Sequence, residues 1–585
     1  MAALFTTPKR NDNTSGAHFV EPDVRRRTLL AHGSWRRVTR RIVVGAVCAL
    51  TVSSLLMPSV SLAAEWVNVG GMQYNAGTVA GDEAGTWTWD GADDMKLNGY
   101  NGGEIKAEGK LNVNYEGNNT VTNDNGCGIS VTKDTNENAE LNIQGDASST
   151  LNVTSSGDAI WSEGDINING AGTVNATSTE ADAIDAKGGL AIKGSGNVNA
   201  MGESDGIRAH NDITIDNSGT IAAKATRNPG INAHNSLTVK GGGKVEAGSI
   251  NDIAIWADGN IEITGGSQVK ANSEEDSAVV ATRKLTVTNA SLNASGAVYG
   301  VHAWEGVTFD HATVTARASA GGSQAIALFT DWDDIVIKNG SIVDALAEGE
   351  FSAAISTSNY HPNGTGGHIY ISDSVVKAIA RYVESGGDGP DHYSTDQNGE
   401  ITPEPRGMNL GIFAQTEKGI TPATISIIRS RVTAEGDTAA IFALALSADG
   451  EAIGTIEIEG APIQKPAGGK VIDYRNKEEL SDGIVYEAGQ TIGTGDVTID
   501  SPYDQDVSKS VAIVPPEEAK PEEKPGETKP EGTKTTKTVA AVATGAKTTG
   551  KLAATGDALG AVIVATALAG TAAIAAGAVV SRKRS

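Results

Sequence analysis

An internal repeat with a period near 24 residues runs from about Gly91 to Gly460 and limits the possible folds more than any other feature. Each unit has three positions filled almost always by Ile, Val or Leu. The first is occupied by Ile160, Ile184, Ile207, Ile231, Ile255, Val279, Val301 and Ile326. The second is occupied by Ile166, Leu190, Ile213, Leu237, Ile261, Leu285, Val307 and Ile335. The third is occupied by Val174, Val198, Ile221, Val245, Val269, Leu292, Val314 and Ile342.

Alternation of apolar and polar residues around these ladder positions, with Gly, Asn and Asp between them, indicates short strands joined at corners. One unit buries too little apolar surface to fold alone. Stacked at about 4.8 Å, each strand pairs with its copies above and below, and the ladder residues form continuous columns inside. A helical repeat is excluded because the 3.6-residue apolar stripe of a helix is missing from this region.

The sequence therefore predicts an all-β fold, a three-sided parallel β-helix (solenoid) of about thirteen coils spanning roughly 60 Å. The coils occupy 105–460, and weaker copies are centred on Ile105, Ile129, Ile355, Ile412 and Ile441. Because solenoid ends must be covered, 64–104 is predicted to be an N-terminal entry or cap segment, and 461–504 a C-terminal cap. A break in the period predicts a long inserted loop at 359–408.

Composition narrows the function classes. The 585 residues carry a formal net charge of -26, which repels phosphates and argues against a nucleic-acid partner. Only 4% of the residues are aromatic, so a conventional aromatic-rich core is not expected. Of the two cysteines, Cys48 lies in a segment expected to be removed, and Cys127 then has no intramolecular partner. A disulfide framework or a cysteine-based metal site is not expected.

The N-terminal segment 1–63 is predicted to be a signal peptide. A long arginine-rich stretch precedes the apolar run 42–56, and small residues follow, with cleavage expected after Ala63 or Ala64. The alternative is a transmembrane anchor, although the apolar run is short and ends in proline and small residues. The pair Arg40-Arg41 also resembles a twin-arginine export signal, and the export route stays open.

The C-terminal segment 552–585 contains the motif Leu552-Ala553-Ala554-Thr555-Gly556, an apolar stretch at 559–580 and a basic end. A predominantly apolar stretch of twenty-two residues suffices for a transmembrane helix. This tail resembles the sorting signal of sortase-anchored wall proteins, in the Leu-Ala-x-Thr-Gly variant of actinobacteria. The resemblance implies cleavage after Thr555 by a sortase, attachment to peptidoglycan, and a cell-surface location in a Gram-positive type of bacterium. A simple membrane anchor is the alternative. The Pro-, Glu-, Lys- and Thr-rich segment 505–551 is predicted to be an extended linker.

The first face of the predicted solenoid differs from the other two. Residues one and three positions after a ladder residue point outward. On this face they include the candidate glycan-binding residues Trp161, Asp185, Arg208, His210, His234, Trp256, Asp258, His302 and Trp304. Indole faces stack on sugar C–H surfaces while polar groups bind hydroxyls, so this pattern favours a carbohydrate site. The alternative is that the Trp side chains are covered by neighbouring residues or a loop.

An enzyme is a second reading of the same face. Parallel β-helices resemble pectate lyases and polygalacturonases, which catalyse on one strand face. However, no close Asp pair occupies neighbouring coils at these positions, as paired-carboxylate hydrolysis requires. Asp185 and Arg208 are adjacent and are also explained by a cross-strand ion pair. Fold alone implies no function, and no catalytic residue is assigned.

Acidic residues in the predicted loop 359–408 raise the question of calcium. Asp388, Asp391 and Asp396 are weak candidate ligands, but their spacing does not match an EF-hand loop. A solvated acidic loop is the favoured explanation, because such loops arise easily. No cofactor is assigned.

Segment 85–103, which contains Trp87 and Trp89, resembles the entry region of actinobacterial surface proteins known as carbohydrate-binding domain-containing proteins. The two Trp residues are also suited to plugging the open end of the solenoid. Together these features favour a wall-anchored, adhesin-like protein that binds extracellular carbohydrate on host or neighbouring cells. A surface polysaccharide lyase or glycoside hydrolase and a passive structural spacer are the alternatives.

Overall fold

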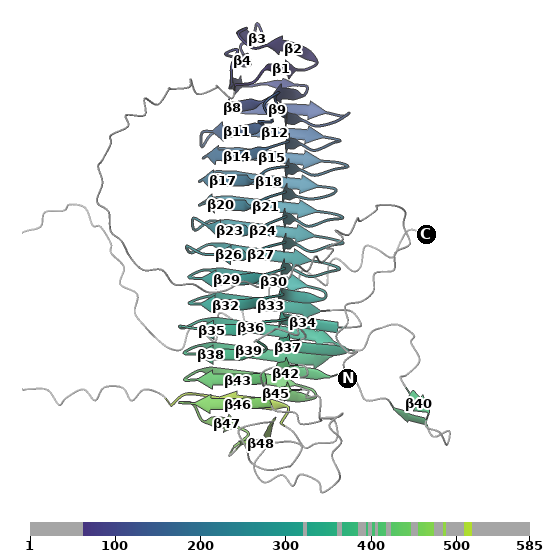
Figure 1. The fold of residues 1–585 in the computed structure, drawn as a ribbon, viewed down its shortest axis with the longest axis vertical. Coiled ribbons are helices and arrows are strands. Elements are labelled where there is room, and N and C mark those ends of the chain that lie inside the picture. The colour runs from purple at the N-terminus through teal and green to yellow at the C-terminus, as the bar shows by residue number, and fades with distance from the viewer. Residues whose placement is uncertain are drawn as a thin grey trace, which may run out of the picture. The chain divides into compact units, whose positions relative to one another are not determined.

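In the computed structural model, the described residues are 63–319, 324–359, 366–383, 393–395, 401–403, 408–416, 423–445, 454–467, 469–472, 484–486 and 508–516. They contain strands wound into a stack of coils (Figure 1). No helix long and apolar enough to cross a membrane occurs among them. The predicted signal peptide, apart from Ala63, and the whole predicted sorting signal lie outside the described residues.

Three parallel sheets, named sheet 1, sheet 2 and sheet 3 after the ladder position that each contains, form the sides of the stack. The thirteen parallel strands of sheet 1 are β7 (Ile105–Glu108), β10 (Ile129–Thr132), β13 (Ile160–Ser162), β16 (Ile184–Ala186), β19 (Ile207–Ala209), β22 (Ile231–Ala233), β25 (Ile255–Ala257), β28 (Val279–Ala281), β31 (Tyr299–Ala303), β34 (Gln324–Thr330), β37 (Phe351–Asn359), β42 (Asn409–Thr416) and β45 (Ala439–Ala445).

The parallel strands of sheet 2 are β5 (Asp94–Asn98), β8 (Lys110–Glu116), β11 (Glu140–Gly145), β14 (Asp165–Gly170), β17 (Leu190–Gly194), β20 (Ile213–Asn217), β23 (Leu237–Lys240), β26 (Ile261–Ile263), β29 (Lys284–Thr288), β32 (Gly306–Asp310), β35 (Ile335–Lys338), β38 (Ile369–Ser372), β43 (Ala423–Ile428) and β46 (Gly454–Glu459). Those of sheet 3 are β6 (Asn101–Gly102), β9 (Asn118–Asn123), β12 (Thr150–Ser155), β15 (Thr173–Ser178), β18 (Asn197–Gly202), β21 (Thr220–Ala225), β24 (Lys244–Ser249), β27 (Gln268–Ser273), β30 (Ser291–Gly296), β33 (Thr313–Ser319), β36 (Ile342–Gly349), β39 (Val375–Tyr382) and β44 (Arg431–Gly436).

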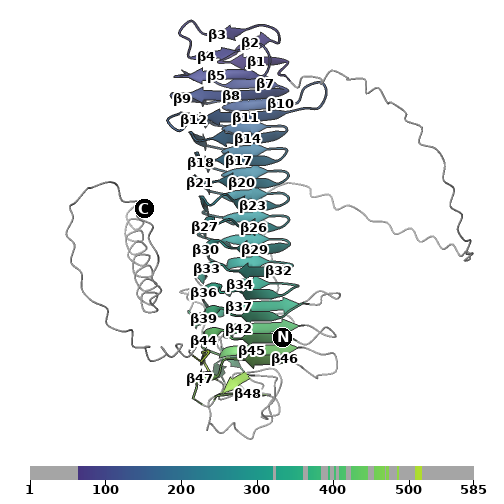
Figure 2. The same cartoon turned by 90° about the vertical axis from the view of Figure 1, so that its left-hand side faces the viewer.

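Strand pairing places the ladder residues of successive coils directly over one another. Ile207 pairs with Ile231 in sheet 1, and Ile213 pairs with Leu237 in sheet 2. These side chains are buried and belong to one continuous hydrophobic cluster along the stack. The side view in Figure 2 shows the coils following one another along one axis. The predicted all-β parallel β-helix of about thirteen coils is confirmed.

Glycine and asparagine keep neighbouring coils in register. At the corner between sheets 2 and 3, an added Cβ on Gly196 would overlap the carbonyl oxygen of Gly172 in the preceding coil, so only glycine fits. On the outer surface of sheet 2, the amide of Asn142 donates to Asn112 Oδ1 at 2.8 Å, and that of Asn167 donates to Asn142 Oδ1 at 3.0 Å. These amides therefore bind one another along the stack.

Two predicted ladder residues are wrong by a short shift in register. In sheet 1, Val301 pairs with Leu328, whereas Ile326 pairs with Tyr299 and is buried in a separate small cluster with Phe329 and Ala353. In sheet 3, Val314 pairs with Val343, and the predicted residue Ile342 is only half-buried. Both strands contain apolar residues at nearby positions, so the sequence pattern is compatible with two strand registers. Only the strand pairing seen in the fold distinguishes them.

The predicted loop at 359–408 is not one continuous loop. Strands β38 and β39 lie inside it and complete a normal coil, because β38 pairs with β35 and β43, and β39 pairs with β36 and β44. A separate hairpin of β40 (Tyr393–Thr395) and β41 (Ile401–Pro403) also falls in this range. The candidate calcium ligands Asp388, Asp391 and Asp396 lie outside the described residues.

Antiparallel strands cover the N-terminal end. They are β1 (Trp66–Val69), β2 (Met72–Asn75), β3 (Ala80–Gly81) and β4 (Trp87–Trp89). Strand β1 pairs with β7 at the end of sheet 1, and β4 pairs with β5 at the end of sheet 2. Trp87 and Trp89 are buried and join the core cluster, so they close this end of the solenoid.

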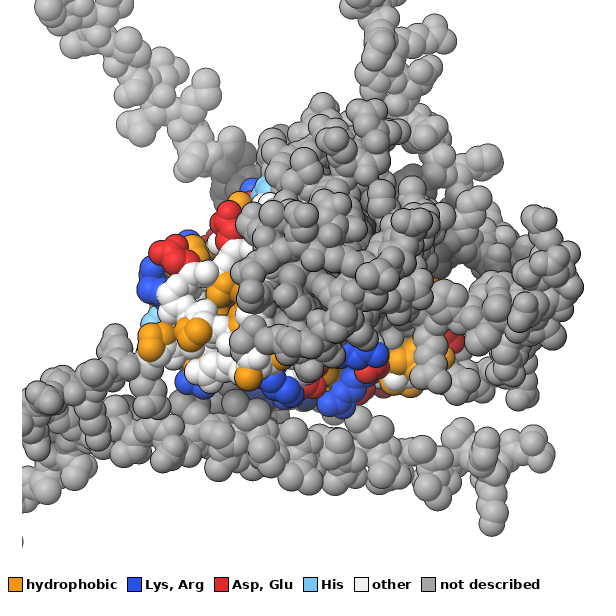
Figure 3. Space-filling model, turned by 90° about the horizontal axis from the view of Figure 1, so that it is seen from below, with side chains coloured by type: hydrophobic (Ala, Val, Ile, Leu, Met, Phe, Trp, Pro, Cys, Tyr) orange, Lys and Arg blue, Asp and Glu red, His pale blue; other side chains and the backbone are white. Residues whose placement is uncertain are grey.

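The C-terminal end carries β47 (Ile463–Lys465), β48 (Lys470–Ile472), β49 (Ile484–Tyr486) and β50 (Ser510–Ile513). Strand β50 pairs antiparallel with β44 and β47, and Val511 and Ile513 are buried. The structure thus places part of the segment predicted as linker, 505–551, against the last coil. Seen from this end, basic and acidic side chains lie next to one another on the visible described surface (Figure 3).

Candidate functional site

The outer surface of sheet 1 brings the predicted residues into one row. Strand pairing stacks its members in register across seven coils, in the order Trp161, Asp185, Arg208, Asn232, Trp256, Val280 and His302. Six steps of about 4.8 Å give the row a length of about 29 Å. A second row begins where these strands end and includes Lys187, His210, His234, Asp258 and Trp304. The two rows, together with Asp331 and Trp332 in the next coil, are called the strip below.

Exposure along the strip is uneven. Trp161, Trp256 and Trp304 are half-buried, so each indole keeps part of its surface in contact with solvent. Asp185 and His302 are 2% and 8% exposed, although both were expected to point into solvent. These two side chains can therefore support their neighbours but offer little surface to a large ligand.

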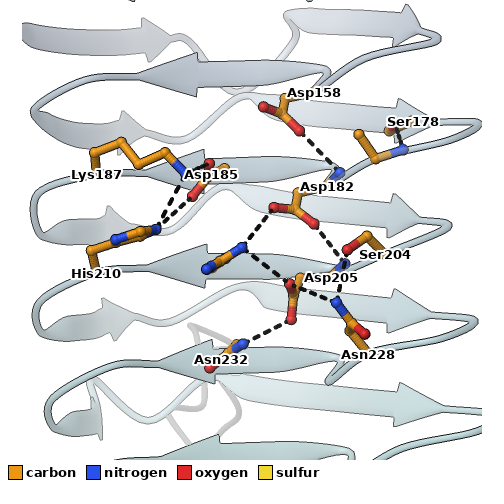
Figure 4. Close-up of polar contacts among 12 residues, drawn as sticks. Asp158, Ser178, Asp182, Asp185, Lys187, Ser204, Asp205, His210, Asn228 and Asn232 are labelled. Carbon is orange, nitrogen blue, oxygen red and sulfur yellow. Dashed lines mark hydrogen bonds and ion pairs between the residues drawn. The ribbon is translucent and has the colours of Figure 1, made fainter. Parts of the chain in front are cut away.

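The middle of the strip is a chain of charged and imidazole groups. Lys187 Nζ lies 2.6 Å from Asp185 Oδ2 and 3.2 Å from His210 Nε2 (Figure 4). The rings of His210 and His234 stack with their centroids 4.9 Å apart. Burial lowers the pKa of both histidines, and the positive charge of Arg208 lowers it further. Both imidazoles are therefore mainly neutral at neutral pH.

His234 Nδ1 in turn lies 3.8 Å from Asp258 Oδ2. These contacts bring His210, His234 and Asp258 next to one another.

Two aromatic positions flank this middle section on its C-terminal side. Trp256 Nε1 donates a hydrogen bond to Asp258 Oδ1 at 2.9 Å. Two coils further along, the rings of Trp304 and Trp332 meet edge to face, with centroids 5.6 Å apart and planes at 64°. The strip therefore offers indole surfaces at both of these points.

Trp332 was missed by sequence reasoning. Its backbone N–H donates to Trp304 O at 2.9 Å, so the coil that contains it holds one additional residue after β34. A count of three positions from the predicted ladder residue Ile326 ends at Phe329 and does not reach the tryptophan. The signal in the sequence was the tryptophan itself, three residues before the next ladder residue, Ile335.

Three aspartates at the corner leading into sheet 1 were also missed. Asp158, Asp182 and Asp205 each stand two residues before a ladder residue in consecutive coils. Asp158 Oδ1 accepts a hydrogen bond from the backbone N–H of Asp182 at 3.1 Å, and Asp182 Oδ1 accepts one from that of Asp205 at 2.8 Å (Figure 4). The recurring Asp-Ala-Ile and Asp-Gly-Ile in the sequence was the available signal.

Arg208 turns toward this column instead of forming the expected cross-strand pair with Asp185. Its Nη1 lies 3.7 Å from Asp182 Oδ2 and 3.9 Å from Asp205 Oδ2. Asp205 is fully buried and Asp182 is 6% exposed. A catalytic carboxyl must come within hydrogen-bond distance of the bond it cleaves, and these two cannot reach a polysaccharide. They hold the corner together.

Burial raises the pKa of Asp205 to about 7 and that of Asp158 to about 6, and the charge of Asp182 adds to both shifts. An Asp in an unfolded chain has a pKa near 3.8. Between these values the folded state binds more protons than the unfolded state, so stability falls as pH rises from about 4 to about 7.

Asp205→Asn should remove much of this pH dependence. Because the amide carries no charge, we expect the variant to melt at a higher temperature than the wild type at about pH 8 and to lose that advantage at about pH 4. The difference between the two pH values is at most about 4 kcal/mol. Thermal unfolding of both proteins across this range measures it. A constant difference in melting temperature at every pH would contradict the prediction.

One group of carboxylates among the described residues has the geometry of a metal site. Oxygen atoms of Asp90, Asp93 and Asp94 lie within 4.8 Å of one another near the N-terminal end. Asp90 Oδ1 already accepts hydrogen bonds from the backbone N–H groups of Ala92 and Asp94, which shapes a turn. This local role accounts for the group, and we assign no calcium site to it.

Comparison with known proteins gives one family match. No curated protein and no solved structure was found to match this chain. Residues 100–342 match the model of a family described as "Carbohydrate-binding domain-containing protein". That segment contains every residue of the strip, from Trp161 to Trp332, and the match supports carbohydrate binding by this part of the chain.

Proposed function

We propose that this chain is a cell-surface, adhesin-like protein that binds an extended glycan along the strip without cleaving it. The observation that supports this best is the set of partly exposed indoles at Trp161 and Trp256, on strands held in register by both neighbouring coils, and at Trp304, directly after β31. Strands position a binding group more rigidly than loops do. Trp161 and Trp256 are four coils apart, about 19 Å, which suits several linked sugar rings.

Display at the cell envelope is the second part of the proposal. It rests on the export segment 1–63 and on the sorting motif from Leu552 to Gly556 with its apolar and basic tail. In this arrangement a sortase joins Thr555 to peptidoglycan, and linker residues beyond β50 carry the solenoid away from the membrane. The ligand is then carbohydrate on a host or neighbouring cell surface.

A glycan array probed with the purified protein tests the binding proposal. We expect each of the changes Trp161→Ala, Trp256→Ala and Trp304→Ala to weaken binding to the best glycan about fivefold, because each removes one stacking surface worth about 1 kcal/mol. The triple variant should lose nearly all binding.

Tyr370→Ala is the matched control, since Tyr370 is an aromatic residue of sheet 2 with 38% exposure. It should bind like the wild type. Full binding by the triple variant would place the ligand elsewhere. Release of unsaturated or reducing sugars from the array glycans would favour the enzyme alternative.

A further inference from the structure

One tryptophan of the strip, Trp256, is hydrogen-bonded to a carboxylate. The indole N–H of Trp256 donates to Asp258, whose side chain remains 44% exposed. The carboxylate is thus held at the edge of the indole while the ring face stays partly open. An indole face attracts cations, and a carboxylate beside it adds an ion pair.

A second position combines the same groups two to three coils away. His302 Nε2 lies 2.6 Å from Asp331 Oδ2, and Asp331 directly precedes Trp332. His302 stands two residues before Trp304, so the carboxylate joins a neighbour of Trp304 to the residue before Trp332, and the two indole rings meet edge to face. The side chain of Asp331 is 26% exposed. Here too a carboxylate is held among residues that carry indoles.

The positive charges of the strip are already neutralised. Lys187 pairs with Asp185, and Arg208 lies close to Asp182 and Asp205. By contrast, among the residues that the structure describes, no Lys or Arg lies within ion-pair distance of Asp258 or Asp331, whose partners are His234 at 3.8 Å and His302 at 2.6 Å. A neutral imidazole leaves the charge of the carboxylate in place, so the strip presents negative charge next to its aromatic residues.

The spacing of these two positions suits an oligosaccharide. Asp258 directly follows β25 and Asp331 directly follows β34, three coils further along the stack, about 14 Å. A glycan chain that advances about one ring per coil would bring the amino groups of two different rings to Asp258 and Asp331.

We propose that the strip selects glycans with free, protonated amino groups, and that a partly N-deacetylated amino-sugar chain is its class of ligand. The inference rests on the proposed glycan-binding function. Each ammonium group lies against an indole face and forms an ion pair with Asp258 or Asp331. Acetylation of the nitrogen removes the charge, so both interactions weaken while ring stacking persists.

Calorimetric titration of the full chain tests this with glucosamine and N-acetylglucosamine oligosaccharides of equal length, at slightly acidic pH and low salt. We expect about tenfold tighter binding of the glucosamine form. Asp258→Asn and Asp331→Asn keep the hydrogen-bond acceptors of Trp256 and His302. Each should weaken glucosamine binding several-fold and weaken N-acetylglucosamine binding by a clearly smaller factor.

Asp216→Asn is the matched control because Asp216, on sheet 2, is 45% exposed and its loss changes the net charge equally. It should have no effect. Equal affinity for both sugars would overturn the amine inference but leave the glycan site standing, whereas no binding of either would overturn the proposed function for this polymer class together with the inference. Equal losses in Asp216→Asn and Asp258→Asn would show general charge attraction and also overturn the assignment.

Discussion

Ile213→Asp should prevent the solenoid from folding, whereas Thr214→Asp, one residue later, should leave it intact. Ile213 is fully buried in β20 and stacks between Leu190 and Leu237. Thr214 is half-buried on the opposite face of the same strand. The change at Ile213 removes apolar burial and places an unpaired carboxylate in the core, at a combined cost of about 5 kcal/mol or more.

Circular dichroism and limited proteolysis of the two purified variants measure the difference. A loss of this size rivals the whole stability of an ordinary domain, which is about 5 to 15 kcal/mol. In a stacked fold each coil contacts only its neighbours. Loss of β20 therefore also exposes the edges of β17 and β23, which pair with it. Equal melting temperatures for the two variants would mean that the inward and outward faces of sheet 2 are misassigned.

The ladder was predictable because its physical cause acts at every coil. The side chain at position 231 must pack between those at 207 and 255. The same packing requirement applies in every coil, so the same residue types recur at this position along the sequence. The ladder residue was predicted wrongly where two apolar residues lie close together in one strand, as Ile326 and Leu328 do, because either could occupy the ladder position. Strands β38 and β39 were missed because insertions around them break the period, although Ile369 and Ile371 are buried like other ladder residues.

The site was predictable only in outline. Alternation along a strand decides which residues face outward, and so the row from Trp161 to His302 follows from the sequence. The direction of a long side chain depends on its surroundings instead. Arg208 turns to Asp182 and Asp205, and no single coil contains that information. The burial of Asp185 and the edge-to-face contact of Trp304 with Trp332 likewise arise only when neighbouring coils are stacked.

A substitution in the N-terminal cap should open that end of the solenoid. Trp89 is fully buried, donates its Nε1–H to Ala92 O at 3.1 Å, and pairs with Met95 across β4 and β5. Replacement of a buried Trp by Ala costs about 3 to 5 kcal/mol. Because β5 is the first strand of sheet 2 to pair in parallel with the coils, its loss exposes the edge of β8.

We therefore expect Trp89→Ala to raise amide hydrogen exchange in β5, β7 and β8 while the central coils stay protected, since a solenoid opens from its ends. The open edge should then pair with other chains, and size-exclusion chromatography should detect oligomers. Trp161→Ala is the matched control: it removes the same side chain from a half-buried position in the middle of the stack. Similar exchange in both variants would show that Trp89 does not hold the end of the solenoid closed.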